Sequence, residues 1–400
     1  MAMYTLPQAQ KNALCDGFFA AFGTQPERFF SAPGRTELSG NHTDHQQGRV
    51  LAGAVNLDMA AAVRENGTDT ICILSQGYPL CRVSLAHLTP QPEEINTTAA
   101  LIRGVAARFT QLGCQVKGFD AYMESTVLPG SGLSSSAAFE VLMGTIINHL
   151  FFCGKVSQPE VAQIGQYAEN VFFGKPCGLM DQMASAVGGM VTIDFADPKN
   201  PVIEQVDFDF SACGHALCII DTRASHADLT DEYAAIPQEL KSVCAYFGKT
   251  VLRQVDEAAF YEALPQLRQQ CSDRALLRAI HFFQENARVP QQVEALRQGD
   301  FDRYLQLMKG SGYSSYMYLQ NVIPGGCTQK QDVAFALALC QKLLGGRGGF
   351  RVHGGGFAGT VQAFVPMDLL ETFRIGIDNI LGQGACHVLS IRPFGGVEVQ

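Results

Sequence analysis

Hydrophobic and polar positions follow two different periods along this chain, and both periods recur over its whole length. Apolar residues alternate as in strands at residues 59–64 and 70–75, with a polar turn at 65–67 between them. Helical spacing is found at residues 98–112, and again at 139–150. Because both periods occur throughout, an all-α or an all-β protein is excluded.

The same patterns continue through the second half of the chain. A further helix is predicted at residues 159–173, and helical patterns dominate from 229 to 344. Further strands are predicted at residues 119–127, 190–195, 215–221 and 360–365. The sequence therefore predicts an α+β protein with mixed sheets and helices.

Pro, Asn and Lys collect near residues 197–201, where the composition of the chain changes. We expect two domains that meet there, residues 1–200 and 201–400, with the active site in the cleft between them. The last strand can return to the N-terminal domain. The length allows each domain a core of ordinary size.

Composition and charge remove several classes of protein. The chain has 29 lysines and arginines against 38 aspartates and glutamates, and this acidic balance argues against a nucleic-acid partner. It has no apolar run of about 18 residues, which argues against a membrane span. The start lacks the basic-then-apolar order of a signal peptide. The 13 scattered cysteines include no Cys-x-x-Cys pair. We therefore expect a reduced, cytoplasmic enzyme, with a monomer favoured.

A loop rich in glycine and serine leads directly into the helical pattern at residues 139–150. A helix N-terminus offers unpaired N–H groups, and glycines let backbone approach an anion closely. A flexible linker or an ordinary capped helix is the alternative, but the strand before the loop and the strong helix after it favour a phosphate cradle. The candidate residues are Gly130, Ser131, Gly132, Leu133, Ser134, Ser135 and Ser136.

Two better-known phosphate motifs do not fit. Gly248, Lys249 and Thr250 end like a Walker A loop, but Val243 stands where that loop needs glycine. The segment from Gly354 to Gly359 satisfies G-x-G-x-x-G, but a strand pattern follows it instead of the helix that a dinucleotide fold requires.

A polar segment from Arg35 to His45 interrupts apolar sequence near the start of the chain. Its side chains offer donors and acceptors suited to a polyhydroxylated ligand, with the candidates Asn41, His42, Thr43 and Asp44. A metal site formed by His42, Asp44 and His45 is the alternative, but a third ligand at helical spacing is missing.

Several segments together resemble the galactokinase family of the GHMP small-molecule kinases. Residues 33–48 are similar to its signature G-R-x-N-L-x-G-E-H-T-D-Y, and residues 128–138 to its P-x-G-x-G-L-S-S-S-A loop. Residues 354–360 resemble its third glycine-rich motif, while 168–170 and 177–182 resemble its A-E-x and C-G-x-M-D-Q segments. These matches stand in family order across nearly the whole chain.

The resemblance implies transfer of the γ-phosphoryl group of ATP to O1 of galactose. It places ATP phosphates on residues 130–136 and Mg²⁺ on Ser136 and Glu169. It places Asp181 beside the sugar O1 hydroxyl, oriented by Arg35. The implied sugar-binding residues are Asn41, His42, Thr43, Asp44, Gly178 and Tyr233. Taken alone, Glu169 is an ordinary helix carboxylate and Asp181 an ordinary helix cap.

The chain departs from the family pattern at several positions. Glu37 stands where the family has Asn, Asn41 where it has Glu, and His45 where it has Tyr. An arginine pair that follows the family tyrosine is absent after Tyr233, and Ala358 replaces a glycine. Another sugar 1-kinase, acting on galacturonate, N-acetylgalactosamine or arabinose, is therefore an alternative. A sensor that binds galactose and ATP without catalysis and a metal hydrolase are further alternatives.

Overall fold

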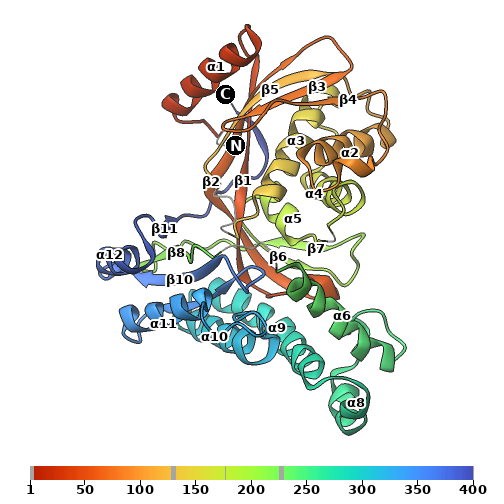
Figure 1. The fold of residues 1–400 in the computed structure, drawn as a ribbon. Coiled ribbons are helices and arrows are strands. Elements are labelled where there is room, and N and C mark those ends of the chain that lie inside the picture. Colours follow the sequence, from red (N-terminus) through yellow and green to blue (C-terminus); the bar gives the residue numbers. More distant parts are fainter. Residues whose placement is uncertain (1–3, 128–131, 176, 225–228, 400) are drawn as a thin grey trace.

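The computed structural model describes residues 4–127, 132–175, 177–224 and 229–399. Figure 1 shows two sheets, with the long strands β1 and β2 running from the upper part of the molecule to the second sheet. The fold is α+β, as the sequence predicts.

Within the described residues, the larger sheet has eight strands. Their order is β12-β1-β2-β5-β3-β4, and β6 pairs with both β2 and β7. Only β3 and β5 pair in parallel among these strands. The bounds are β1 Arg28–Ser39, β2 Arg49–Glu65, β3 Thr70–Ser75, β4 Cys81–Ser84, β5 Phe119–Ser125, β6 Met190–Asp194, β7 Val202–Gln205 and β12 Val397–Val399.

The smaller sheet is antiparallel, in the order β11-β8-β10-β9. Its bounds are β8 His215–Asp221, β9 Gly349–His353, β10 Thr360–Pro366 and β11 Cys386–Leu389. Alternate residues of β8 face opposite sides, because successive side chains of a strand point in opposite directions. Cys218 and Ile220 face one hydrophobic core, whereas Leu217 and Ile219 face another.

Helices cover both sheets. The helices up to residue 187 are α1 Gln8–Phe22, α2 Thr98–Gln111, α3 Ser135–Phe151, α4 Gln158–Tyr167 and α5 Met180–Val187. The later ones are α6 Thr230–Tyr246, α7 Glu257–Glu262, α8 Leu264–Gln270, α9 Asp273–Arg297, α10 Phe301–Ser314, α11 Asp332–Leu344 and α12 Leu370–Leu381. Short 3₁₀ turns are η1 Asp44–Gln46, η2 Pro92–Glu94 and η4 Leu252–Gln254, and π-helical turns are η3 Ala168–Phe173 and η5 Ser315–Leu319.

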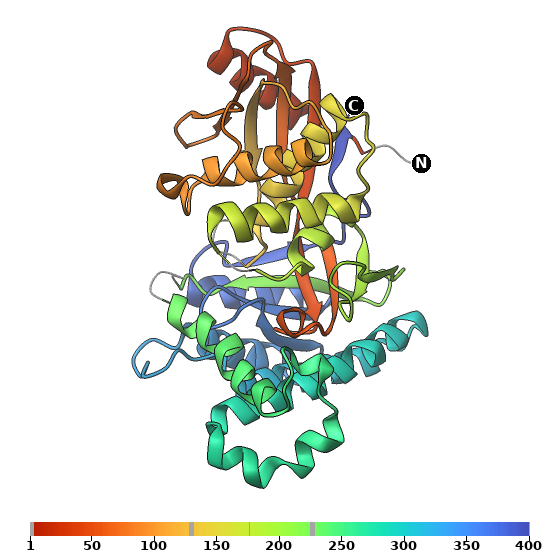
Figure 2. The ribbon, with the colours of Figure 1, turned by 90° about the vertical axis from the view of Figure 1, so that its right-hand side faces the viewer.

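The larger sheet is covered on its two faces by different helices. The α1 side chains Leu14 and Phe18 pack on Ala60 and Ala62 of β2, whereas α2, α3 and α4 pack in a separate, larger core. Figure 2 shows α2 and α4 in front of this sheet, with the helices from α6 to α9 gathered at the other end of the molecule.

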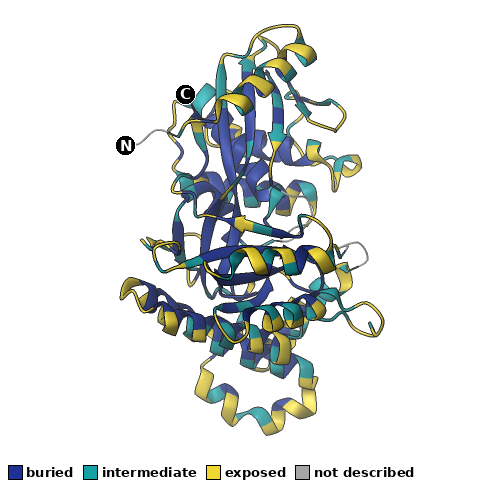
Figure 3. Ribbon diagram, turned by 90° about the vertical axis from the view of Figure 1, so that its left-hand side faces the viewer, coloured by how far each residue is buried: buried dark blue, intermediate teal, exposed yellow. Residues whose placement is uncertain are grey.

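One hydrophobic core joins the two halves of the chain. It contains Leu38 and Leu51 from the larger sheet, Leu133 from the Gly/Ser loop, Val293 from α9 and Phe364 from β10. Figure 3 shows the buried residues running continuously along the long strands toward the second sheet. The segments that carry the candidate site are thus fixed by shared packing. The predicted domain boundary near residue 200 stays a prediction.

The predicted elements agree closely with the structure where the pattern is regular. β3 and β8 have the predicted bounds, and β10 differs by one residue. The predicted helix at 159–173 is α4 followed by the π-helical turn η3. The strand predicted at 59–64 is the last part of the much longer β2. None of the helices in the described ranges is long and apolar enough to cross a membrane.

Candidate active site

Arg35 and Asp181 form the ion pair at the centre of the candidate site. Arg35 lies on β1 beside a bulge in its pairing with β2, and Asp181 lies in the first turn of α5. Arg35 donates from Nε to Oδ1 at 2.7 Å and from Nη2 to Oδ2 at 2.8 Å, so that the pair is bidentate. The Arg35 side chain is buried, whereas that of Asp181 is about a third exposed. The aspartate is therefore the member that a ligand can reach.

The Gly/Ser loop is bound to this ion pair. Arg35 Nη1 donates to the Gly132 carbonyl, and the Ser134 hydroxyl donates to Asp181 Oδ2. Ser134 has φ +56° and directly precedes the first turn of α3. Burial alone raises the pKa of the Asp181 carboxyl, but the charge and hydrogen bonds of Arg35, with the Ser134 hydroxyl, lower it below its usual value. Asp181 is therefore ionised at neutral pH.

Some of the other predicted residues of the Gly/Ser loop lie within the described residues, and others lie outside them. Leu133 is fully buried and anchors the loop in the shared core, and Ser135 and Ser136 open α3. The helix N-terminus thus lies at the loop, as the sequence predicts. Gly130 and Ser131 lie outside the described residues. The phosphate-binding role of this loop stays a prediction.

Glu169 lies on the π-helical turn η3, an irregularity that is common at functional sites. Gln182 donates from Nε2 to Glu169 Oε2 at 2.9 Å and to Glu140 Oε2 at 3.0 Å. Glu140 lies one turn after Ser136 on α3, so Gln182 joins Glu169 to the helix that Ser136 begins. Lys175 lies 3.6 Å from Glu169 Oε1.

Burial, and then the nearby charge of Glu169, raise the pKa of Glu140 well above its usual value. Its Oε1 is buried and has no hydrogen-bond partner among the described residues.

Three predicted sugar-binding side chains converge on the third glycine-rich motif. Asn41 donates to the carbonyl of Gly354 at 2.6 Å, His42 Nε2 to that of Gly355 at 2.9 Å, and the Tyr233 hydroxyl to that of Gly356 at 2.8 Å. A Cβ at residue 355 would lie 2.9 Å from the Tyr233 ring, and at 356 it would clash with Asn321. The glycines are therefore needed for these close approaches.

His42 is neutral at physiological pH. Burial, and then the neighbouring His45, lower the pKa of His42 to about 3. Since the Gly355 carbonyl can only accept, the proton lies on Nε2. Nδ1 is left as an acceptor for a ligand hydroxyl.

Asn41 is fully buried, and its amide is used entirely within the protein. Its Nδ2 donates to Glu37 as well as to Gly354, and its Oδ1 accepts from Ser315 at 3.1 Å and from Asn321 at 2.9 Å. This uses both acceptor sites and both donors of the amide. Asn41 therefore ties the polar segment to η5 and to the glycine-rich motif. Its direct contact with a sugar stays a prediction.

Thr43 and Asp44 differ in how many hydrogen bonds their side chains form within the protein. The buried Thr43 hydroxyl contacts the Gly40 and Arg49 carbonyls, at 2.9 and 2.5 Å. Asp44 accepts the N–H of His45 at 2.9 Å and lies against Gly178, where a Cβ would fall 1.7 Å from Asp44 Oδ2. Gly178 thus lies beside Asp44, and the sugar-binding roles of both residues stay predictions.

Sequence reasoning missed a buried layer behind these residues. Glu37 on β1 pairs with Arg351 on β9, and both side chains are essentially inaccessible. Burial raises the pKa of Glu37 above its usual value, although Arg351 and Arg35 act against this. Sequence reasoning also gave no role to Gln182 and Glu140, which lie beside Glu169 instead. The one sequence signal of the Glu37–Arg351 pair was a glutamate at position 37, where the family has asparagine.

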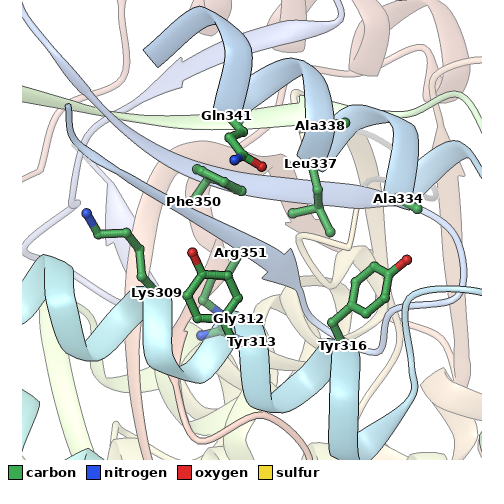
Figure 4. Close-up of a pocket in the computed structure, with 10 residues that line it drawn as sticks. All are labelled: Lys309, Gly312, Tyr313, Tyr316, Ala334, Leu337, Ala338, Gln341, Phe350 and Arg351. Atoms are coloured by element: carbon green, nitrogen blue, oxygen red, sulfur yellow. The ribbon is translucent and has the colours of Figure 1, made fainter. Parts of the chain in front are cut away.

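Two cavities in the described part of the chain lie at different places in the fold. One, of about 240 Å³, is lined by Asp44, His45, Cys177 and Gly178, among others, and therefore borders the candidate site. The other, of about 250 Å³, lies between α10 and α11 and is lined by Tyr313, Tyr316 and Phe350 (Figure 4). None of the predicted site residues lines the second cavity. Over the described ranges, no group of three His, Cys, Asp or Glu side chains could hold a metal ion.

Comparisons with known proteins agree with this arrangement. Residues 100–189 match the family model of the GHMP kinases N-terminal domain, and residues 16–65 match that of the galactokinase galactose-binding signature. The crystal structure of Lactococcus lactis galactokinase complexed with galactose superposes with a TM-score of 0.84 at 22% identity, covering 97% of this chain and 99% of that one. The crystal structure of Methanococcus jannaschii mevalonate kinase superposes with a TM-score of 0.64 at 13% identity, covering 92% of this chain and 99% of that one. The chain thus has the fold of the GHMP kinases.

Curated relatives define the family more narrowly. A galactokinase of Actinobacillus pleuropneumoniae serotype 3 is 32% identical over 359 residues, which are 89% of this chain and 90% of the relative. A galactokinase of Streptomyces coelicolor is 31% identical over 392 residues, which are 97% of this chain and 98% of the relative. The chain belongs to the galactokinase family.

Proposed function

We propose that this protein is a galactokinase, which transfers the γ-phosphoryl group of ATP to O1 of α-D-galactose. The arrangement of Asp181 carries the proposal. An ionised, partly exposed carboxylate at a helix N-terminus is held by Arg35 and by Ser134 of the Gly/Ser loop. One carboxylate beside the sugar O1 hydroxyl and one loop for the phosphates are the two parts that the reaction needs.

In this proposal, Arg35 couples the two substrates. It bonds Asp181 with two nitrogens and the Gly132 carbonyl with the third, so that the carboxylate and the phosphate loop keep one relative position. Asp181 attracts the proton that the O1 hydroxyl loses on attack. Since Arg35 and Ser134 hold the pKa of Asp181 low, the carboxylate serves chiefly as an ionised charge partner. The positive charge of Arg35 also stabilises the transition state; such an arginine contributes up to about 10³–10⁵ in rate in related chemistry.

Kinases of this family use ATP, and we propose that Mg²⁺ accompanies it, held by Ser136 and Glu169. The residues fit a hard cation, because Ser136 and Glu169 offer oxygen ligands and the nearby buried Glu140 Oε1 has no hydrogen-bond partner among the described residues. When bound, Mg²⁺ would neutralise phosphate charge. Gln182 orients the Glu169 carboxylate through its hydrogen bond.

The sugar itself is proposed to contact His42 Nδ1, Asp44, Gly178 and Tyr233, with Asn41 and Thr43 holding these groups in place. One observation supports the alternative that the protein is a kinase for another sugar. Asn41 stands where the family has glutamate, and its amide is used within the protein. The enzyme therefore lacks one charged acceptor for a sugar hydroxyl, which favours tolerance for a sugar altered there, such as galacturonate or N-acetylgalactosamine.

A sugar panel tests the proposal. Purified protein is incubated with MgATP and each of galactose, galacturonate, N-acetylgalactosamine and arabinose, and both ADP and sugar 1-phosphate are measured. We expect galactose 1-phosphate, with the highest kcat/KM for galactose. A higher value for another sugar would select the alternative kinase, and binding of galactose and ATP without turnover would select a sensor. Activity that requires zinc but not ATP would point to a hydrolase.

A further inference from the structure

The longest helix, α9, carries three buried polar side chains on one face. His281, Glu285 and Gln292 are spaced by four and seven residues, which places them above one another along the helix. Their exposed fractions are 2%, 0% and 0%. Figure 1 shows α9 across the lower ends of β1 and β2, where the polar segment joins these strands. None of the three was predicted from the sequence.

Each of these side chains holds one of three successive residues of the polar segment. Gln292 Oε1 accepts from the Ser39 hydroxyl. Glu285 Oε1 accepts from the Gly40 N–H at 3.1 Å. His281 Nε2 contacts the Asn41 carbonyl at 2.9 Å. The helix therefore fixes consecutive backbone and side-chain groups just before His42.

The His281 contact has a defined direction. The Asn41 carbonyl can only accept, so Nε2 carries the proton, while Nδ1 lies 2.9 Å from the Ser314 hydroxyl. Burial lowers the pKa of His281, which keeps the ring neutral. Nδ1 then accepts from Ser314. Both ring nitrogens are satisfied and the ring cannot turn without losing two buried hydrogen bonds.

The Glu285 carboxylate is also fixed by hydrogen bonds from other residues, as the His281 ring is. Its Oε1 also accepts from the Ser311 hydroxyl at 2.7 Å, and its Oε2 pairs with Arg288. The Gly40 N–H is thus bonded to a carboxylate that other residues already hold in place. Gly40 has φ +91°, and a Cβ there would lie 2.5 Å from the Arg49 carbonyl, so this turn admits little variation.

We propose that His281, Glu285 and Gln292 are positioning residues for sugar recognition, which fix residues 39–41 and thereby place His42 and Asp44. His42 directly follows the fixed run and has φ +59°, a conformation that a residue other than glycine keeps only when its surroundings impose it. The inference rests on the proposed function only in naming the ligand as a sugar. The three contacts themselves do not depend on it.

This role has a selective consequence. The α9 contacts reach the sugar-binding side of the site, whereas the phosphate loop, Asp181 and Arg35 are held by a separate set of bonds. Loss of an α9 contact should therefore weaken sugar binding without equal loss of MgATP binding. A merely structural role would lower the amount of folded protein and leave both KM values of the remainder unchanged.

Two matched pairs of variants test the proposal. His281→Phe removes the donor to Asn41, whereas His281→Gln keeps an Nε2 donor of similar reach. Gln292→Leu removes the acceptor of Ser39, and Gln291→Leu makes the same change at the exposed neighbouring position. For His281→Phe and Gln292→Leu we expect the galactose KM to rise about 10-fold, the effect of losing one buried hydrogen bond, and the MgATP KM to stay within about 2-fold. The other two variants should resemble the wild type.

Hydrogen exchange provides a readout that needs no substrate. Backbone amides of residues 39–48 should exchange faster in His281→Phe and Gln292→Leu, with those of α3 unchanged. Unchanged exchange in 39–48, or equal rises in both KM values, would overturn the proposal. If the wild type does not phosphorylate galactose, the proposed function fails, and the exchange measurement still decides whether α9 positions this segment.

Discussion

Two of the arginine–carboxylate pairs on strand β1 lie in opposite surroundings. Arg35 pairs with Asp181, whose side chain is about a third exposed, whereas Glu37, two residues on, pairs with Arg351 where both side chains are nearly inaccessible. The pKa of Asp181 is lowered, because Arg35 and Ser134 outweigh burial. The pKa of Glu37 is raised, because burial outweighs the arginines.

The difference separates two uses of the same chemistry. The partly exposed carboxylate, Asp181, stays ionised at little cost in free energy and can contact a ligand, so it is suited to catalysis. The closed carboxylate joins the larger sheet to β9 and cannot meet a ligand. A buried pair adds little net stability over apolar residues, but removing one partner leaves a charge unpaired. Replacing a member of the Arg35–Asp181 pair should therefore lower chiefly the activity. Replacing a member of the Glu37–Arg351 pair should lower chiefly the free energy of unfolding.

Replacement of the open carboxylate should have the largest effect. Asp181→Asn keeps the shape but removes the charge beside the sugar hydroxyl, and we expect kcat to fall by roughly 10²–10⁴-fold. Binding of galactose and ATP, followed by calorimetry, should be largely kept. Asp197→Asn, at an exposed turn, is the matched control and should leave kcat unchanged. Normal turnover in Asp181→Asn would remove this residue from its proposed role.

Replacement of the closed carboxylate should act on stability instead. Glu37→Gln leaves the buried Arg351 without its counter-charge. The Nε and Nη1 atoms of Arg351 already have no hydrogen-bond partner among the described residues. We expect the free energy of unfolding in urea to fall by about 3–5 kcal/mol. The kcat of the folded fraction should change far less than in Asp181→Asn. The double replacement Glu37→Leu with Arg351→Met should cost less than Glu37→Gln alone, and a larger cost would contradict the comparison.

A third pair, the buried Glu285 with Arg288, allows the comparison to be tested by changing the pH. Burial raises the pKa of Glu285, but the charges of Arg288 and Arg351 and the hydrogen bond from Ser311 act against it, and the pKa falls from 4.5 to about 2. A carboxylate with a lowered pKa stabilises the fold above pH 4.5 and loses this contribution as the pH falls toward 2. The shift corresponds to about 3 kcal/mol. Glu285→Gln should therefore cost about that much at pH 7 and much less at pH 2.5. Equal costs in chemical unfolding at both pH values would refute this assignment.

The sequence predicts those parts of the site that lie in one short segment each. Arg35, Ser134 and Asp181 were found through local motifs, and the structure brings all three together. The bounds of β3 and β8 follow from regular apolar alternation. β1 was missed as a strand because its polar side chains, such as Glu37, are buried in a polar layer and hide the alternation.

The supporting layer could not be predicted, because its partners lie far apart in the chain. Glu37 and Arg351 are separated by 314 residues, and Asn41 and His281 by 240. No local pattern pairs such residues. In the sequence of a helix such as α9, a buried polar residue cannot be told from an exposed one by its neighbours. The sequence did show that Glu37 and Asn41 exchange the Asn and Glu of the family pattern. It did not show their partners Arg351 and Asn321.

The exposed end of β1 provides the smallest expected effect. Arg28 pairs with Glu398 of β12 through two bonds of 2.6 Å, and the side chains are 30% and 34% exposed. Water screens this pair, and such surface pairs contribute about 0.2–1 kcal/mol. Glu398→Gln should therefore lower the free energy of unfolding by less than 1 kcal/mol, about the surface value, and the loss should shrink in concentrated salt. A loss as large as that of Glu37→Gln would mean that geometry, and not burial, sets the cost of breaking these pairs. The contrast between Asp181 and Glu37 would then need another cause.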